Sequence, residues 1–271
     1  MKSTAMRVSI VLLAVAALGV TVICEPLMAA EAKKAPAKPA KPTKPKDPAF
    51  EAFKKKAKVP VVKVPLVPKA PKIDGVLDKK VYAKCEPMKF RFITGGSAKP
   101  TAATTAYAVT TKKELCLFFK CESPDMDALL KDVREHDGQV WNDDCIELFI
   151  DPTNKRQLDG YMHIIVNALG TTSEAKGPGG AEDYSWNPKL TVKTKVGKKD
   201  WTVEMSIPLA ELVKDVKKIN RAWAVNLNRM AYLIEGNEDT AWSPTGQSSS
   251  HVPSRFGILW LEAGKVDNTK K

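Results

Sequence analysis

The strongest constraint on the fold of this chain is an alternation of apolar and polar residues in two stretches, residues 114–122 and 145–151. A period of two belongs to a half-buried β-strand, because successive side chains of a strand point to opposite faces. In the second stretch, one set of side chains opposes the other: Ile146, Leu148 and Ile150 against Cys145, Glu147 and Phe149. We therefore expect the first set to lie in a core.

Seven further stretches have the composition of strands, and helical patterns are few. The strand candidates are residues 89–93, 105–110, 161–167, 190–196, 201–207, 222–232 and 256–261. Residues 197–200 have the chemistry of a hairpin turn, so the strands on either side are expected to be antiparallel neighbours. Helical turns are predicted only at residues 77–83, 127–135 and 209–216. The pattern predicts an all-β fold, an antiparallel β-sandwich of the jelly-roll or immunoglobulin-like kind with a few short helical turns.

The first 58 residues differ in composition from the rest. Residues 1–30 resemble a signal peptide, with Lys2 and Arg7 before an apolar run and small residues at its end, which predicts export to the periplasm or beyond the cell. Lipid anchoring through Cys24 is not expected, because Ile23 precedes it. Residues 31–58 form a Lys/Pro/Ala-rich linker predicted to be disordered, with a helical turn at residues 50–58. Residues 59–262 are the predicted domain, and residues 263–271 form a basic tail.

The formal net charge of +12 lies mostly outside the predicted domain. Ten lysines against three acidic residues fall between positions 31 and 58, and the tail adds more. A basic tail gives only weak, salt-sensitive attraction to phosphates, so nucleic acid is not an expected partner. The arm is suited to acidic polymers at a cell surface. No apolar stretch after the signal peptide is long enough to span a bilayer.

Four cysteines remain after the signal peptide, namely Cys85, Cys116, Cys121 and Cys145. An even number in an exported protein permits two disulfides in three pairings, but the prediction favours buried free thiols. Cys116 and Cys121 are five residues apart on one predicted strand, so they point to opposite faces and cannot bridge each other. Their spacing matches no metal motif, and with only three scattered histidines a zinc site is not expected.

Tryptophans of two kinds occur in the predicted domain. Trp201, Trp223 and Trp260 lie in apolar runs, whereas Trp141, Trp242 and Trp186 lie among Asn, Asp and Ser. A sugar offers C–H faces that stack on aromatic rings and hydroxyl rims that hydrogen-bond to polar groups. Aromatic residues in polar loops therefore indicate carbohydrate binding, and the competing interpretation is that they cover one end of the sandwich.

The order and spacing of several motifs resemble the family 9 carbohydrate-binding modules along the whole predicted domain. The most specific motif is residues 141–151, WNDDCIELFID. Others are IDGVLD at residues 73–78, LFFKCESPD at residues 117–125, the strands at residues 161–170 and 201–208, residues 223–229, and WSP at residues 242–244 with Pro253, Phe256 and Gly257. The resemblance implies a jelly-roll-like β-sandwich that binds the end of an oligosaccharide or polysaccharide.

Carried over by position, the resemblance implies that Trp141 and Trp242 clamp a sugar, that Glu147 accepts its hydroxyls and that Arg229 donates to them. The family's other arginine has no counterpart here, and His163 is the residue available on that strand. For Glu147 the competing interpretation is a strand carboxylate paired with an arginine, and for His163 it is a strand polar residue without a ligand.

The resemblance also implies a structural calcium ion in addition to the sugar. Hard oxygen ligands are dense between residues 125 and 144, and Asp125 and Asp127 are the candidates for calcium. Surface acids that balance the lysines are the competing interpretation, because no stretch matches an EF-hand loop.

The predicted function is binding without catalysis. Asp143 and Asp144 point to opposite faces, so they cannot flank one glycosidic bond, and no nucleophile elbow or phosphate loop occurs. Such modules are commonly attached to glycoside hydrolases, which implies a role in polysaccharide catabolism alongside them. Two alternatives stay open. One is a haem-binding redox sandwich with Met162, Met205 or Met230 as ligand, and the other is an envelope scaffold that binds proteins.

Overall fold

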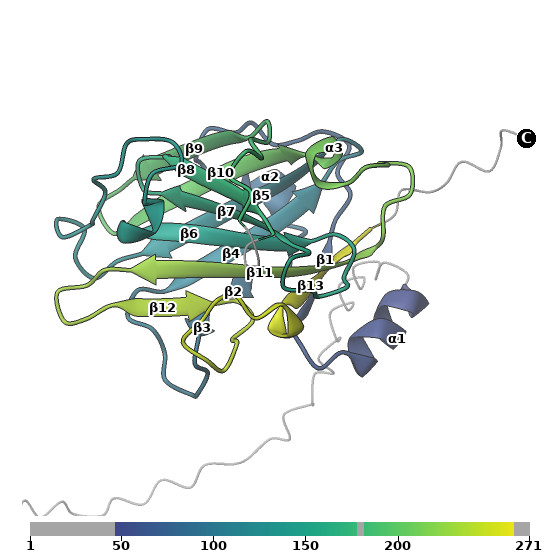
Figure 1. Cartoon of the computed structure of the whole chain (residues 1–271), viewed down its shortest axis with the longest axis horizontal. Helices are drawn as coiled ribbons and strands as arrows, with labels where there is room; N and C mark the ends of the chain where they lie inside the picture. The colour runs from purple at the N-terminus through teal and green to yellow at the C-terminus, as the bar shows by residue number, and fades with distance from the viewer. Residues whose placement is uncertain (1–46, 178–181, 263–271) are drawn as a thin grey trace, which may run out of the picture. The chain divides into compact units, whose positions relative to one another are not determined.

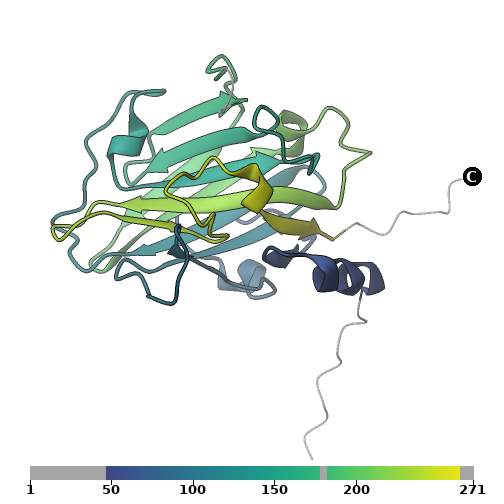
Figure 2. The ribbon, with the colours of Figure 1, turned by 60° about the horizontal axis from the view of Figure 1, so that its bottom comes forward.

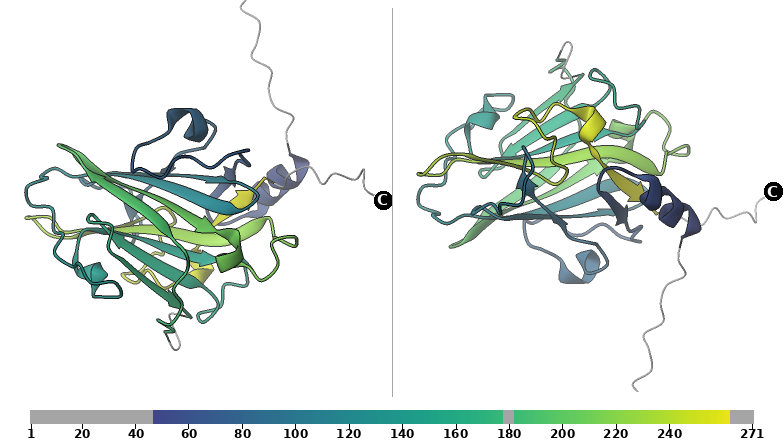
Figure 3. Two further views of the ribbon diagram at one scale, coloured as in Figure 1. Left: turned by 90° about the horizontal axis from the view of Figure 1, so that it is seen from above. Right: turned by 90° about the horizontal axis from the view of Figure 1, so that it is seen from below.

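The structure, a computed structural model, describes residues 47–177 and 182–262. Two β-sheets face each other in a sandwich (Figures 1 and 3). The larger, mixed sheet has the order β1-β13-β11-β6-β7-β8, with β12 paired to β11 and β3 paired to β12. Its strands are β1 (Val61–Val64), β3 (Arg91–Phe92), β6 (Cys145–Asp151), β7 (Met162–Asn167), β8 (Thr172–Lys176), β11 (Ala222–Ala231), β12 (Glu238–Ala241) and β13 (Gly257–Leu261).

The smaller sheet is antiparallel and has the order β2-β4-β5-β10-β9. Its strands are β2 (Met88–Lys89), β4 (Thr104–Thr110), β5 (Glu114–Glu122), β9 (Thr191–Val196) and β10 (Asp200–Pro208). The predicted turn at residues 197–200 closes the β9–β10 hairpin through a hydrogen bond from the Gly197 N–H to the Asp200 carbonyl at 2.8 Å. The predicted all-β sandwich is therefore confirmed.

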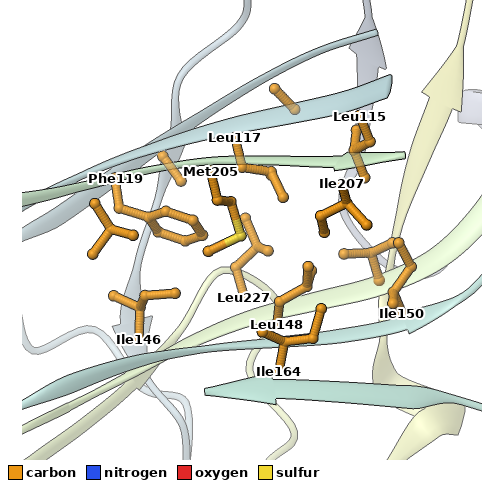
Figure 4. Packing of buried hydrophobic residues seen from close by; sticks show 14 of the residues in the cluster. Leu115, Leu117, Phe119, Ile146, Leu148, Ile150, Ile164, Met205, Ile207 and Leu227 are labelled. Carbon is orange, nitrogen blue, oxygen red and sulfur yellow. The ribbon is translucent and has the colours of Figure 1, made fainter. Parts of the chain in front are cut away.

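The main core fills the space between the two sheets, and Figure 4 shows its centre. Leu115, Leu117 and Phe119 come from β5, and they face Ile146, Leu148 and Ile150 of β6. All six side chains are fully buried. The alternation in these two strands thus predicted the inward face correctly. Burial of apolar surface stabilises the fold by about 25 cal/mol per Å², so the apolar side chains lie on the face that is removed from water.

The methionines considered as haem ligands do not gather around one cavity in the part of the chain that the structure describes. Met162 and Met205 belong to the main core, and Figure 4 shows Met205 among Phe119, Leu117 and Leu227. Met230 packs instead in a small cluster with Val140 and Cys145. All three positions match the use of methionine as a filler of irregular gaps in a core.

Helix α1 (Pro48–Lys56) packs beside the β13 end of the larger sheet (Figure 2). Its Phe50 and Phe53 contact Trp260, with ring centroids 6.0 and 4.9 Å apart. Asp47 caps the helix through Ala49 and Phe50 N–H groups, and it also pairs with Arg221 at 2.5 Å. The helical turn expected at residues 50–58 is therefore confirmed, although it begins at Pro48, and its two phenylalanines supply an apolar face that covers the sheet. Residues 31–46 of the predicted linker lie outside the described residues.

Not every predicted element forms. The single predicted strand at residues 89–93 is divided at Phe90, since β2 pairs with β4 and β3 pairs with β12 in the other sheet. Helical turns form at α2 (Lys79–Tyr82) and α3 (Leu209–Leu212), but residues 127–135 contain no helix. Strands β1, β8 and β12 were not predicted.

The four cysteines of the domain are free thiols; Cys116, Cys121 and Cys145 are buried, whereas Cys85 is half-buried. Cys121 lies in the main core, whereas Cys116 lies in a separate cluster on the outer side of the smaller sheet, which confirms that the two point to opposite faces. Burial raises the pKa of the Cys116 thiol to about 11.

Within the described residues, no helix is both long and apolar enough to cross a bilayer. The predicted signal peptide, Cys24 and the basic tail lie outside the described residues.

Candidate functional site

A cavity of about 270 Å³ lies on the outer face of the larger sheet, on β6, β7 and β8. Its floor comes from outward-facing side chains of these strands, and its walls come from η1 (Val140–Asn142) and two loops. The lining residues are Trp141, Glu147, His163, Ile165, Ser173, Ala175, Glu182, Tyr184 and His251. The volume is close to the lower end of the range for ligand sites, roughly 300–1,000 Å³, so it suits a ligand of one or two rings.

Trp141 presents its indole to solvent, with 41% of the residue exposed. The backbone around it is fixed on two sides. Tyr232 donates a hydrogen bond from its hydroxyl to the Trp141 carbonyl at 2.9 Å, and the preceding Val140 is fully buried against Cys145 and Ile165. An exposed ring on an anchored backbone can bind a flat ligand with little loss of conformational entropy.

The loop that leads to η1 is held by buried carboxylates. The Asp143 carboxylate accepts hydrogen bonds from the N–H groups of Asp132 and Val133, and the Asp144 carboxylate accepts one from Leu130. These contacts explain why residues 127–135 do not become helical: their N–H groups bond to side chains instead of to the backbone.

A second set of contacts ties the same loop to the edge strand β8. His136 Nε2 lies 2.8 Å from Glu174 Oε2, and His136 Nδ1 lies 3.3 Å from Asp137 Oδ2. The other oxygen of Asp137 accepts the Glu174 N–H at 3.2 Å. These contacts hold the loop that precedes Trp141 against strand β8.

Glu147 and His163 form a pair at the floor of the cavity. His163 Nε2 lies 2.8 Å from Glu147 Oε2, and both residues are at least nine-tenths buried. The His163 ring stacks on Phe149, with centroids 4.2 Å apart and planes 15° apart. The stacking and the hydrogen bond fix the orientation of both polar groups, which is what recognition of a ligand's hydroxyl groups requires.

His251 reaches the cavity from the loop between β12 and β13. Its Nδ1 lies 2.8 Å from the Tyr161 hydroxyl, and its ring meets Phe149 edge-on at 5.2 Å. Burial and the neighbouring His163 lower the pKa of His251, so the ring is neutral at neutral pH. A neutral ring that accepts the Tyr161 O–H at Nδ1 carries its own proton on Nε2, where it can donate to a ligand.

Tyr184 supplies a second exposed aromatic ring, with 42% of the residue accessible. Its hydroxyl donates to the Glu182 carboxylate, and this hydrogen bond, followed by burial, raises the pKa of Tyr184 to about 12. Tyr184 and Trp141 are the two large aromatic residues that line the cavity.

The predicted position of Trp242 needs correction. It is only 8% exposed and packs in the main core. A Cβ atom on Gly257 would lie 2.6 Å from a ring carbon of Trp242, so the indole occupies the space that this glycine leaves free. The backbone N–H of Trp242 donates to the Leu227 carbonyl at 2.9 Å, which continues the β11–β12 pairing past β12. The structure therefore does not place Trp242 opposite Trp141.

The predicted position of Arg229 also needs correction. It is fully buried between the sheets, and its Nη1 donates to the carbonyls of Ala102 and Glu122 and to Thr104 Oγ1. Its Nη2 lies 3.8 Å from Asp144 Oδ1. The guanidinium thus connects β11 with the ends of β4 and β5, and it does not reach the cavity.

The aspartates predicted to bind calcium lie in a turn. Asp125 Oδ1 accepts the N–H groups of Asp127 and Ala128 at 3.0 and 3.3 Å, which is a local capping role. Among the described residues, the one group of three acidic or histidine donors that lie close together is His136, Asp137 and Glu174. The side chains at Asp125 and Asp127 do not form a calcium cage, and calcium binding stays a prediction.

A half-buried carboxylate next to the site, that of Asp239, predicts a dependence of stability on pH. Burial, with a smaller contribution from the Glu147 charge, raises the pKa of Asp239 to about 7. In the unfolded chain the pKa is roughly 3.9, so the stabilisation is complete below about pH 4 and is lost as the pH rises to about 7.

We expect Asp239→Asn to remove this loss. Between about pH 4 and pH 8 the parent protein should lose about 1–3 kcal/mol of unfolding free energy relative to the variant. Urea unfolding at both pH values measures the difference. Parallel changes in the two proteins would contradict the assignment.

Of the sequence-predicted site residues, the structure brings Trp141, Glu147 and His163 together and leaves Arg229 and Trp242 in the interior. Tyr184 and His251 were missed. Both lie on loops distant in sequence from β6, and only the tertiary fold brings them to the cavity. A tyrosine among Glu, Asp, Ser and Asn at residues 182–187 resembles the polar setting of Trp141, and that signal could have identified Tyr184.

Comparison with known proteins gives one family and several structures. A model of the family described as "Carbohydrate family 9 binding domain-like" matches residues 73–264. None of the curated proteins matches the sequence.

Among the solved structures that resemble the fold are the three that follow. One is a proposed carbohydrate-binding protein from Bacteroides uniformis, with a TM-score of 0.62, 16% identity, and coverage of 76% of this chain and 100% of that one. The others are family 9 carbohydrate-binding modules from Caldicellulosiruptor kristjanssonii. The complex with cellotriose has a TM-score of 0.56, 19% identity and coverage of 76% and 96%, and the complex with glucose has 0.55, 18%, and 77% and 100%.

Proposed function

Because this chain belongs to the carbohydrate family 9 binding domain-like family, we propose that its cavity binds the terminal ring of an oligosaccharide or polysaccharide. The observation that carries this proposal is the cavity itself. It combines two exposed aromatic rings, Trp141 and Tyr184, with a fixed Glu147–His163 pair in one hollow of the sheet.

The chemistry of this lining matches the two surfaces of a sugar. Trp141 and Tyr184 offer planar apolar faces for the C–H groups of a pyranose ring. Glu147 keeps one oxygen that is not bonded to His163 and accepts hydroxyl protons, while His251 donates from Nε2. The aromatic partner of Trp141 in this proposal is thus Tyr184 and not Trp242.

The proposed role is binding and not turnover. Asp143 and Asp144, the adjacent acids that follow Trp141 in sequence, do not line the cavity and use their oxygens to hold backbone N–H groups of the supporting loop. The protein would keep a polysaccharide close to glycoside hydrolases that act on it, after export by the N-terminal segment.

A titration with cellotriose tests the proposal through Tyr184. Tyr184→Ala should weaken binding by about 3- to 10-fold, because one stacking contact contributes roughly 0.5–1.5 kcal/mol. Isothermal titration calorimetry measures the affinity. The matched control is Ile234→Ala, which removes a side chain that is 81% exposed on another loop and should leave binding unchanged.

Two results would contradict the proposal. If Tyr184→Ala binds cellotriose as well as the parent does, the cavity is not the site. If no neutral oligosaccharide binds to the parent on a glycan array, the domain serves another purpose, and the scaffold alternative then gains support.

A further inference from the structure

The cavity is lined by acids and lacks strong bases. Glu147 lies at its floor and Glu182 at its wall, and none of the described lining residues is a lysine or an arginine. The basic group nearest to Glu147 is the His163 imidazole, which is already bonded to Glu147 Oε2. A ligand that enters the cavity therefore meets carboxylates without meeting a permanent cation.

The charges of both glutamates act on the same small volume. Burial and His163 lower the pKa of His251, whereas Glu147 and Glu182 both act to raise it. His251 lines the same cavity, so the effect of both glutamates on its pKa shows that their charges act inside the cavity. Low-dielectric walls concentrate such a field in a cleft.

This local acidity contrasts with the rest of the domain, because residues 59–262 contain 28 lysines and arginines and 26 acidic residues, a formal net charge of +2. Lys193 and Lys195, for example, are exposed on the edge strand β9 of the smaller sheet. The acidity of the cavity is therefore a local feature of the site, and it does not follow from the average composition.

Resting on the function proposed above, we propose that the cavity selects sugars by charge: it prefers a ring with a free ammonium group, as in a 2-amino sugar, and rejects a ring with a carboxylate, as in a uronic acid. An ammonium group can donate to Glu147 or Glu182 in place of a hydroxyl and gains a charge-assisted hydrogen bond. A uronate carboxylate would lose its hydration beside two like charges and find no cation to compensate it.

The aromatic walls restrict this preference to cyclic ligands. Trp141 and Tyr184 give the ring faces a stacking surface that an acyclic amine cannot use. The ligand class is thus an amino sugar and not ammonium compounds in general, and a simple diamine such as cadaverine separates the two.

The test compares four ligands on the full-length protein at about pH 6, where an aliphatic amine is protonated. The ligands are glucosamine, N-acetylglucosamine, glucuronate and cadaverine, with cellotriose as the reference for neutral sugar binding. We expect glucosamine to bind about 3- to 10-fold more tightly than N-acetylglucosamine at low salt, and this ratio to fall at high salt. Glucuronate and cadaverine should bind more weakly than N-acetylglucosamine.

Two charge-neutralising variants locate the effect. Glu182→Gln, which changes an exposed wall residue, should reduce the ratio of glucosamine to N-acetylglucosamine affinity by about 2- to 3-fold. Glu235→Gln removes an equal charge from an exposed position outside the cavity and should leave the ratio unchanged.

The outcomes distinguish this inference from the proposed function. If cellotriose binds but glucosamine binds no better than N-acetylglucosamine, or glucuronate binds as well as either, the charge selection is wrong and the sugar site stands. If cadaverine matches glucosamine, the cavity takes ammonium without requiring a ring, and the amino-sugar assignment is wrong. If none of the sugars binds, both proposals fail.

Discussion

Arg229→Met should lower the free energy of unfolding by about 3–5 kcal/mol, because it removes a guanidinium that satisfies three acceptors on two segments. Methionine keeps the apolar stem but leaves the Ala102 and Glu122 carbonyls and the Thr104 hydroxyl without this donor. Two of the guanidinium nitrogens, Nε and Nη2, have no hydrogen-bond partner of their own. Burial of these two nitrogens already destabilises the parent protein. The expected loss of unfolding free energy in the variant is therefore smaller than the summed energies of the three hydrogen bonds that are removed.

The loss should also depend on pH. Burial raises the pKa of Asp144, and the positive charge of Arg229 opposes this rise. Without that charge the pKa of Asp144 rises further, so the variant gains an additional penalty above the unfolded pKa of about 3.9 and is relieved of it in acid. Urea unfolding at about pH 4 and pH 7 should show the smaller difference at the lower pH.

Arg91→Leu is the matched control, because Arg91 is exposed on β3 of the same sheet and should change stability by less than about 0.5 kcal/mol. A cellotriose titration of folded Arg229→Met separates the two roles of this residue. If the variant keeps the parent's stability but loses the sugar, Arg229 is a ligand contact and its buried position is wrong.

Trp141→Ala should weaken sugar binding and leave stability nearly unchanged, whereas Trp242→Ala should lower stability and leave binding nearly unchanged. Trp141→Ala should weaken cellotriose binding by about 10- to 100-fold, or roughly 1.5–3 kcal/mol, because both stacking and buried apolar area are lost. Its unfolding free energy should change by less than about 1 kcal/mol, since the ring is 41% exposed and the anchoring contacts of its backbone remain.

Trp242→Ala should instead lower the unfolding free energy by about 3–5 kcal/mol, as expected for a large aromatic side chain removed from a packed core. The slot over Gly257 would become a void. Cellotriose affinity of the folded fraction should stay within about 2-fold of the parent, because the residue does not line the cavity.

Chemical unfolding measures the unfolding free energy of each variant, and calorimetric titration measures its affinity for cellotriose. A loss of binding in Trp242→Ala at unchanged stability would restore the clamp formed by Trp141 and Trp242. A Trp141→Ala variant that binds normally would remove the aromatic wall from the proposed site.

Much of the fold could be predicted from the sequence because its central strands alternate clearly. In β5 and β6 every inward residue is apolar, so the period of two fixes both the strand and its face. Strands β8 and β12 were missed because both carry polar residues on both faces, and Glu174 and Glu238 are buried through hydrogen bonds to loops. Such bonds leave no hydrophobic pattern.

The same parity argument would have corrected one site residue. Arg229 shares its face of β11 with Trp223, Val225 and Leu227, all in the main core, whereas Asn226 and Asn228 face outwards. Strand periodicity therefore places Arg229 inside the sandwich, and the resemblance that gave it a role in sugar binding overrode this signal. The burial of Trp242 could not be predicted in this way, because it depends on the bare backbone of Gly257 fifteen residues later.

The pairing of β1 with β13 brings the first and last strands of the domain side by side, with Val61 beside Ile258. Because the two strands are parallel, the start of β1 lies beside the start of β13, and residues 59 and 262 lie at opposite ends of the pair, about 20 Å apart at a rise of about 3.3 Å per residue. A circular permutant therefore needs a flexible linker of about a dozen residues that runs back along this pair. With such a linker, and with the chain opened at the exposed turn near residue 158, the domain should retain the cavity.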